Sequence, residues 1–448
     1  MQRTNFVVVW TILIASLILT SLLGSFLQPA RQKSLALTTE DLQLQLLWLK
    51  DDPEYGSLVQ KLLPEDPIAA TRDRYREGYQ EAGAKEDLTD LRLKLGLLAA
   101  KSGQTQQALA LWAKAGTPGQ VLTGLYGQPP HLLPNSEAIL RKALQGWYQQ
   151  EGLTDLYRLQ GQALPGRKAA QQELARHTLF RLVGVNGFQV VATLLGLVLL
   201  IREGWLWAAK KRTWKQSWSV PWTLTDATLV VVGWLTASFM LAFVLRDFGT
   251  PLLDRLIPAP DLKLAVFVFL SKALDTLVAL ALFGWWIGRA HPRAEILRLR
   301  VQGLSWGVGA YLAVLPLVWS AALLTQGLVK GGGGNPLLSV IQQSQNPWAG
   351  VLLFVTVALL APISEELLFR GLLFSGFTTV MSAPWAMVAS GFIFGAIHQS
   401  AAEFLPLSVL GIVLAYSYYR TRNLAVPLLL HICFNSVTFG TLLLLGGA

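Results

Sequence analysis

Two adjacent carboxylates and a guanidinium interrupt an apolar stretch in the last quarter of the sequence. Glu365 and Glu366 follow the apolar residues 351–360, and Arg370 comes four positions after Glu366. Charged groups at the centre of a membrane helix cost about 2.5 to 3.5 kcal/mol each on insertion scales, so they usually mark a functional site. Acids in such a site could take a proton from water or bind a metal ion. The i, i+4 spacing of Glu366 and Arg370 also suits a purely structural ion pair, and the sequence leaves this alternative open.

Two of the five histidines lie on later apolar segments. His398 ends the sequence Phe394-Gly-Ala-Ile-His398, and His431 opens His431-Ile-Cys-Phe-Asn435. The i, i+4 spacing places Phe394 with His398, and His431 with Asn435, on shared helical faces. A single histidine on an apolar helix is usually a satisfied core residue. Two of them downstream of a buried pair of acids indicate a common site.

Three motifs, in this order, resemble those of the Abi or CPBP family of CAAX proteases and bacteriocin-processing enzymes: Glu365-Glu366-x-x-x-Arg370, Phe394-x-x-x-His398 and His431-x-x-x-Asn435. The resemblance extends over about residues 225–446. It implies an intramembrane endopeptidase similar to the type II CAAX prenyl endopeptidases. The residues that it implies as catalytic are Glu365, Glu366, His398, His431 and Asn435, with Arg370 and Phe394 supporting them.

By this resemblance, Glu365 and His398 would activate water, whereas His431 and Asn435 would hold the oxyanion. Zinc bound by Glu365, His398 and His431, with water as its fourth ligand, is an alternative. The sequence lacks the His-Glu-x-x-His pattern of common zinc peptidases, and the amide of Asn435 suits an oxyanion better than it suits zinc. We therefore favour direct activation of water by glutamate, with no cofactor required.

The composition places these motifs in an all-α, polytopic membrane helix bundle. Of the 448 residues, 52% are hydrophobic and 14% are charged, and the mean hydropathy is +0.43, as is typical of multi-pass membrane proteins. Cys433 is the single cysteine, which excludes an intrachain disulfide. We expect about eight or nine transmembrane segments, at residues 6–27, 183–201, 227–245, 264–288, 304–325, 348–379, 384–400, 404–420 and 424–446.

A soluble helical domain is expected between the first two spans. Residues 31–182 carry charges and Gln at helical spacing, and residues 95–115 resemble one tetratricopeptide-type hairpin. Such a hairpin suggests a protein partner for this domain. Residues 1–30 would form a signal anchor and first transmembrane helix, residues 183–300 further transmembrane helices, and residues 301–448 the catalytic core.

Clusters of Lys and Arg predict the orientation in the membrane. They occupy loops near residues 202–215, 289–300 and 420–422, which should therefore be cytoplasmic, whereas acids balance the cations of residues 246–263. The soluble domain would then be extracytoplasmic. Because the cations flank apolar segments, the net charge of +10 indicates contact with the lipid bilayer rather than with nucleic acid.

The spacing of the motifs predicts one shared site. A turn at residues 382–384 would join two antiparallel helices, so that Glu365 and His398 reach a similar depth in the cytoplasmic half of the membrane. The chain leaves few residues between His398 and the next apolar segment, which predicts a helix break within the membrane. Lys272 and Asp275, three residues apart in one span, should form a local ion pair.

These patterns predict an intramembrane endopeptidase that hydrolyses membrane-associated, prenylated or leader-peptide substrates. The main alternative is a non-catalytic membrane adaptor or immunity-type protein with the same fold, in which the charged residues only stabilise the bundle. A transporter that uses the acids as a proton relay is a further alternative, against which stands the lack of an evident inverted repeat.

Overall fold

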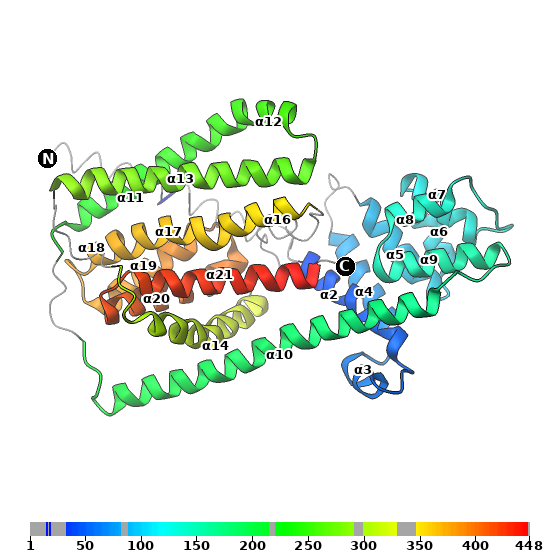
Figure 1. Cartoon of the computed structure of the whole chain (residues 1–448), viewed down its shortest axis with the longest axis horizontal. Helices are drawn as coiled ribbons and strands as arrows, with labels where there is room; N and C mark the ends of the chain where they lie inside the picture. Colours follow the sequence, from blue (N-terminus) through cyan, green and yellow to red (C-terminus); the bar gives the residue numbers. More distant parts are fainter. Residues whose placement is uncertain are drawn as a thin grey trace. The chain divides into compact units, whose positions relative to one another are not determined.

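The chain is helical wherever the computed structural model describes it (Figure 1). The described residues are 15–16, 18, 33–81, 88–214, 220–290, 299–328 and 346–446. The predicted first span, residues 6–27, lies outside them except for three residues. The described residues fall mainly into two compact units, Pro29–Gly187 and Phe188–Leu443. The prediction of an all-α polytopic membrane protein is confirmed.

The first unit is a bundle of short helices. Helices α5 and α6 form a hairpin in which Gly103 turns the chain with φ 79°. Gly96 faces the Trp112 ring so closely that a Cβ atom would lie 2.2 Å from Nε1, and Nε1 itself donates to the Leu93 carbonyl at 3.2 Å. The helices are α2 (Lys33–Leu46), α3 (Gly56–Leu62), α4 (Pro67–Glu81), α5 (Thr89–Lys101), α6 (Thr105–Trp112), α7 (Gly116–Tyr126), α8 (Ser136–Ala143) and α9 (Gly146–Leu159).

A buried polar cluster joins four helices of this bundle. Asp41 of α2 accepts hydrogen bonds from the hydroxyls of Tyr75 and Tyr148, each at 2.7 Å, and from Lys94 Nζ at 3.2 Å. Burial raises the pKa of the Asp41 carboxyl above its ordinary value. Because every polar group of the cluster has a partner, it fixes how α2, α4, α5 and α9 pack.

The second unit is the membrane unit, since most of its helices are long and apolar. Seven helical stretches in the described residues have the length and composition to span a bilayer, from Arg167–Ala208 to Ala425–Leu445, and the apolar helix Ala383–Ala396 is shorter. Its elements are the second half of α10 (Arg167–Ala208), α11 (Leu224–Val244), α12 (Thr250–Leu256), α13 (Pro260–Ala290), α14 (Leu304–Leu328), α16 (Pro347–Phe354), α17 (Ala361–Glu365), α18 (Ser375–Phe377), α19 (Ala383–Ala396), α20 (Ala401–Thr421) and α21 (Ala425–Gly446).

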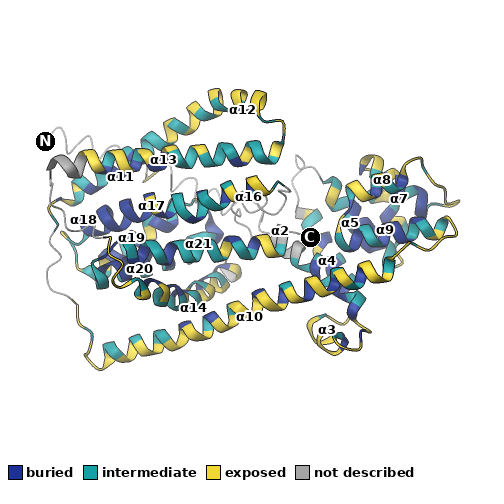
Figure 2. Cartoon of the chain, viewed as in Figure 1, coloured by how far each residue is buried: buried dark blue, intermediate teal, exposed yellow. Residues whose placement is uncertain are grey.

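The stretch Pro347–Phe377 is the central helix of the membrane unit. Figure 1 shows it between α13 and α21, and Figure 2 shows that the residues around α17 are its most buried part. Half of the residues in its most apolar segment are buried, compared with 17% in the corresponding segment of α10. Helix α10 therefore exposes apolar side chains, as a lipid-facing helix does. The helix begins at the cap residue Asn346 and contains π-helical segments at Val355–Leu360 and Glu366–Phe374.

Helices α19 and α20 pack through small residues. A Cβ atom added to Gly391 would lie 2.8 Å from the Ser408 carbonyl oxygen, and one added to Gly395 would lie 2.6 Å from the Phe404 carbonyl oxygen. On α20, a Cβ atom added to Gly411 would lie 2.8 Å from Gly391 Cα. Small residues of this kind let membrane helices approach closely. Between the two helices, residues 397–400 are not helical, as the predicted break requires, and Gln399 has a φ of 54°.

Candidate active site

Glu366 and Arg370 form the most buried part of a polar cluster on the central helix. The Oε1 atom of Glu366 lies 3.0 Å from Arg370 Nη1 and 2.7 Å from His431 Nδ1. The side chains of Glu366 and Arg370 are 1% and 0% exposed, and Glu366 Oε2 has no hydrogen-bond partner among the described residues. An ionised carboxylate only accepts, so Nδ1 of His431 carries the proton of this bond. Glu366 therefore fixes both the guanidinium and the imidazole ring.

Arg370 connects the central helix to α19 and α20. Its Nη2 atom donates to the Gly411 carbonyl at 3.2 Å, and its guanidinium carbon lies 4.4 Å from the centre of the Phe394 ring. A desolvated contact of this type stabilises by about 2 kcal/mol. The ion pair with Glu366 that the sequence predicts is present, and it is part of a larger network.

Glu365 faces a different set of partners. Its Oε1 atom lies 3.5 Å from Lys272 Nζ on α13, and its Oε2 atom lies 3.9 Å from His431 Nε2. Lys272 also lies 3.0 Å from Asp275 Oδ2, and Ser238 of α11 donates to Asp275. Of the two adjacent glutamates, Glu365 has the looser contacts, which leaves its carboxylate able to bind a water molecule.

Both imidazoles pack against the ring of Phe394. Ring centres are 5.0 Å apart for Phe394 and His398 and 5.8 Å apart for Phe394 and His431. His398 lies in the turn after α19, where its Nδ1 atom is 2.8 Å from the Phe394 carbonyl oxygen. A carbonyl can only accept, so Nδ1 is the protonated nitrogen and Nε2 is free to act as an acceptor. His398 interacts electrostatically with Glu365, without a hydrogen bond between the two in the described residues.

Asn435 donates a hydrogen bond to a backbone carbonyl of the central helix. This carbonyl has no N–H donor within the helix, because Pro362 stands at the position that would donate. Ala361 donates to the Thr356 carbonyl, five residues back. In this register the next donor is residue 362, which is proline and has no N–H. Asn435 Nδ2 donates to the acceptor of that missing bond, the Val357 carbonyl, at 2.8 Å. One amide proton of Asn435 is thus used structurally, and the other is available for a substrate.

The charges of the cluster nearly cancel. Glu365, Glu366 and Asp275 provide three negative charges, against two positive charges on Lys272 and Arg370. An imidazolium at His431, which lies between two carboxylates, would balance the remaining charge. Its Nε2–H group could then donate a hydrogen bond to an oxyanion.

Glu365, His398 and His431 are the residues of the alternative zinc site. In the ranges that the structure describes, no group of three or more His, Cys, Asp or Glu side chains is arranged to hold an ion. The ammonium of Lys272 lies 3.5 Å from Glu365 Oε1 and supplies positive charge beside this carboxylate. The choice between direct acid–base chemistry and zinc ligation by Glu365, His398 and His431 therefore stays a prediction from the sequence.

The fold is that of an integral membrane protein, and its buried cluster combines carboxylate, imidazole and amide side chains. Residues 347–437 match the family described as Rce1-like, type II CAAX prenyl endopeptidase Rce1-like. This segment contains all three motifs, so the resemblance to the CAAX protease family is confirmed there, over a shorter range than the expected 225–446.

Two relatives with curated descriptions align with part of the chain. "Putative membrane peptidase YdiL" of Bacillus subtilis (strain 168) is 25% identical over 134 residues, which cover 27% of this chain and 54% of that protein. An "Uncharacterized 24.3 kDa protein" of Escherichia coli is 26% identical over 183 residues, which cover 39% of this chain and 80% of that protein. The chain thus spans about half the length of the first relative. No solved structure matches the chain. Together the comparisons support a membrane protease.

Lys272 is the site residue that motif reasoning missed. The sequence indicated its local ion pair with Asp275, which the structure contains, but not its contact with Glu365. Lys272 and Glu365 lie far apart in the sequence and meet only through tertiary packing. The sequence signal for their contact was therefore limited to the presence of a cation, Lys272, within an apolar span.

Proposed function

We propose that the protein is an intramembrane endopeptidase in which Glu365 activates water. The observation that carries this proposal is the arrangement of Glu365 beside His431 Nε2, with His431 held from its other nitrogen by Glu366. Glu365 would take a proton from water as the oxygen attacks the scissile carbonyl, with Nε2 of His398 as a second acceptor. His431 and the free N–H of Asn435 would donate to the oxyanion, and Glu365 would pass its proton to the leaving amine.

Membrane-associated, prenylated or leader-peptide substrates are the classes that this proposal implies. The cluster suits them because Glu365 lies inside a membrane-spanning helix, closer to Phe377 than to Pro347. We place the active site in the cytoplasmic half of the bilayer and the helical unit of residues 31–182 outside the cytoplasm, where it would bind substrates or a protein partner.

The test is cleavage of a peptide library by the purified, reconstituted protein beside Glu365→Gln. The amide is nearly isosteric but cannot act as a base, so we expect activity to fall by about 100-fold or more while the thermal midpoint changes little. Glu173→Gln is the control, because the Glu173 side chain is 77% exposed on α10. A chelator should leave wild-type activity intact, since the proposal requires no metal.

Undiminished cleavage by Glu365→Gln would contradict the role of Glu365, and loss of wild-type cleavage in chelator would support zinc. The burial of the Glu366–Arg370 pair also suits the alternative of a non-catalytic membrane adaptor, in which the charges only stabilise the bundle. An adaptor would cleave nothing, and Glu365→Gln would then change stability alone.

A further inference from the structure

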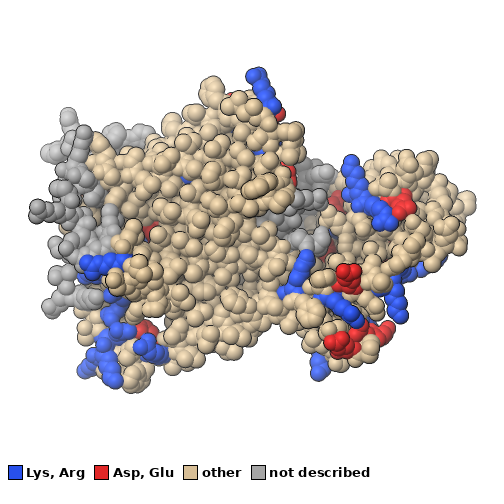
Figure 3. All heavy atoms as spheres, viewed as in Figure 1, with Lys and Arg blue, Asp and Glu red and all other residues tan. Residues whose placement is uncertain are grey.

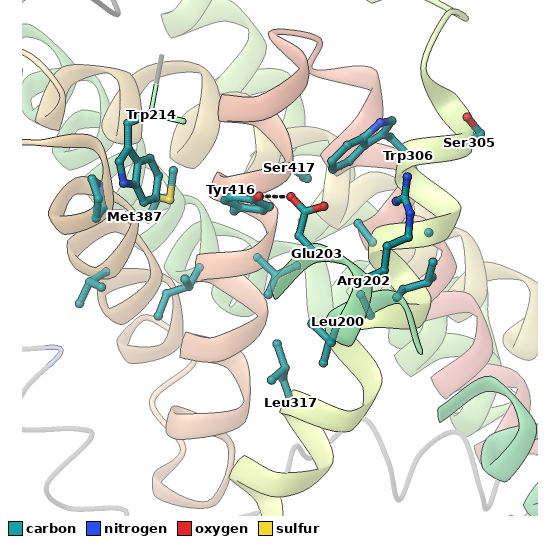
Figure 4. Close-up of a pocket in the computed structure, with 18 residues that line it drawn as sticks. Leu200, Arg202, Glu203, Trp214, Ser305, Trp306, Leu317, Met387, Tyr416 and Ser417 are labelled. Atoms are coloured by element: carbon teal, nitrogen blue, oxygen red, sulfur yellow. Dashed lines mark hydrogen bonds between the residues drawn. The ribbon is translucent and has the colours of Figure 1, made fainter. Parts of the chain in front are cut away.

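A cavity lies in the membrane unit among α10, α14, α19 and α20 (Figure 4), away from the candidate active site. Its volume is 530 Å³, within the range of about 300 to 1,000 Å³ that is usual for small-molecule sites. None of the active-site residues lines it. The cavity is therefore not explained by the proposed protease chemistry.

The cavity changes from apolar to polar along the helix direction. On α14 its lining runs from Ser305 to Leu317, which at 1.5 Å per residue is about 18 Å. Ala310, Ala313 and Leu317 form an apolar wall, whereas Arg202 and Glu203 lie toward the Ser305 end, as Figure 4 shows. This gradient matches an amphiphile that lies parallel to the helices with its head near their ends.

The polar end carries one acid, and that acid is already paired. Glu203 accepts hydrogen bonds from the Tyr416 hydroxyl at 2.6 Å and from Arg212 Nε at 3.1 Å, and Trp207 Nε1 donates to the same hydroxyl at 3.1 Å. Arg202, in contrast, is exposed and forms no hydrogen bond or ion pair with another residue in the described ranges. The free charge at this end of the cavity is therefore positive.

Further cations surround this end of the membrane unit. Lys210 and Lys211 are exposed after the end of α10, and Lys211 Nζ lies 4.4 Å from the centre of the Trp205 ring. Figure 3 shows Lys and Arg gathered where α10 ends. Tryptophans and cations at the ends of apolar helices are typical of the headgroup layer of a bilayer.

We propose that this cavity binds one anionic phospholipid of the surrounding bilayer. One acyl chain lies along the apolar wall of α14, opposite Ile412 and Val413 of α20, and the phosphate meets the Arg202 guanidinium and the Ser305 hydroxyl. A peptide segment is the poorer occupant, because the apolar wall offers no donors or acceptors for its backbone groups.

Native mass spectrometry of the delipidated full-length protein tests this proposal, with phosphatidylglycerol and phosphatidylcholine as probes. We expect phosphatidylglycerol to bind more tightly, and Arg202→Gln to weaken it about fivefold without changing phosphatidylcholine binding. Ala313→Phe places a large side chain in the space along the apolar wall, so it should abolish binding of phosphatidylglycerol. Arg255→Gln and Leu323→Phe are the controls, since Arg255 is exposed on α12 and Leu323 is 66% exposed on α14 outside the cavity.

Equal binding of the two lipids, or equal binding by wild type, Arg202→Gln and Ala313→Phe, would overturn the proposal. Val388→Phe, on the α19 wall, replaces Ala313→Phe if that variant does not give a monodisperse protein. These outcomes do not depend on proteolysis, so the failure of either proposal leaves the other one intact.

Discussion

Glu365 and Glu366 are adjacent in the chain but have different roles in the cluster. Glu366 contacts Arg370 and His431 at 3.0 and 2.7 Å and is almost completely buried, so it organises its neighbours. Glu365 contacts Lys272 and His431 at 3.5 and 3.9 Å, distances that leave room for water to compete. The glutamate with the weaker contacts is the better candidate for a base, because its lone pairs are not all used.

Lys272 is expected to position Glu365. Lys272→Met removes the ammonium that both Glu365 and Asp275 contact, and a buried acid that loses its partner typically destabilises by about 3 to 5 kcal/mol. We expect a lower thermal midpoint and at least a tenfold loss of cleavage, measured as about 1.4 kcal/mol or more of lost transition-state stabilisation. Lys272→Arg should recover most of the stability, because it keeps the charge.

A double variant separates positioning from folding. Lys272→Met with Asp275→Asn removes one positive and one negative charge, so the protein should regain stability. If cleavage returns together with stability, Lys272 has only a structural role. If cleavage stays low in the stable double variant, Lys272 positions Glu365 for catalysis.

At the scale of elements, the π-helical register of the central helix couples Pro362 to Asn435. Asn435→Ala leaves the half-buried Val357 carbonyl without a donor, which should cost about 1 to 3 kcal/mol. Pro362→Ala restores an N–H at residue 362, so in that background Asn435→Ala should cost clearly less. Chemical or thermal unfolding of the four proteins of this cycle measures the difference. Equal costs in both backgrounds would show that residue 362 does not supply the missing donor.

Cleavage by the same four proteins tests the second role of Asn435. If its other amide proton holds the oxyanion, Asn435→Ala should reduce cleavage by about 100-fold or more even where Pro362→Ala has restored stability. Activity that recovers with stability would mean that Asn435 acts only on the Val357 carbonyl.

At this scale the sequence predicts features that depend on neighbouring residues, but not contacts that depend on how helices pack. Residue type and hydropathy predicted the helical membrane fold, the pair of Glu366 with Arg370, and the helix break after His398, because each depends on nearby residues. The π-helical turns were missed, since Pro362 alone permits either a kink or a register change. The contact of Lys272 with Glu365 depends on how α13 packs against the central helix, which no local spacing specifies.

At the scale of the whole molecule, charge divides the two ends of the membrane unit. Cations such as Arg202, Lys210 and Lys211 gather where α10 ends. At the opposite ends of α11 and α13, Arg246 pairs with Asp247 at 2.9 Å and Lys263 with Asp254 at 2.5 Å, so charges there cancel. An excess of cations marks the cytoplasmic side of a membrane protein.

Cysteine labelling measures this orientation, because Cys433 is the single native cysteine. In a Cys433→Ser background, Lys211→Cys, Arg255→Cys and Gln162→Cys each place one thiol at an exposed position. We expect a membrane-impermeant maleimide to label Arg255→Cys and Gln162→Cys in intact cells, and Lys211→Cys only after permeabilisation. The reverse pattern would place the helical unit in the cytoplasm. Glu365, nearer to the cation-rich end of the central helix, would then lie in the outer half of the bilayer, where substrates anchored in the cytoplasmic leaflet would not reach it.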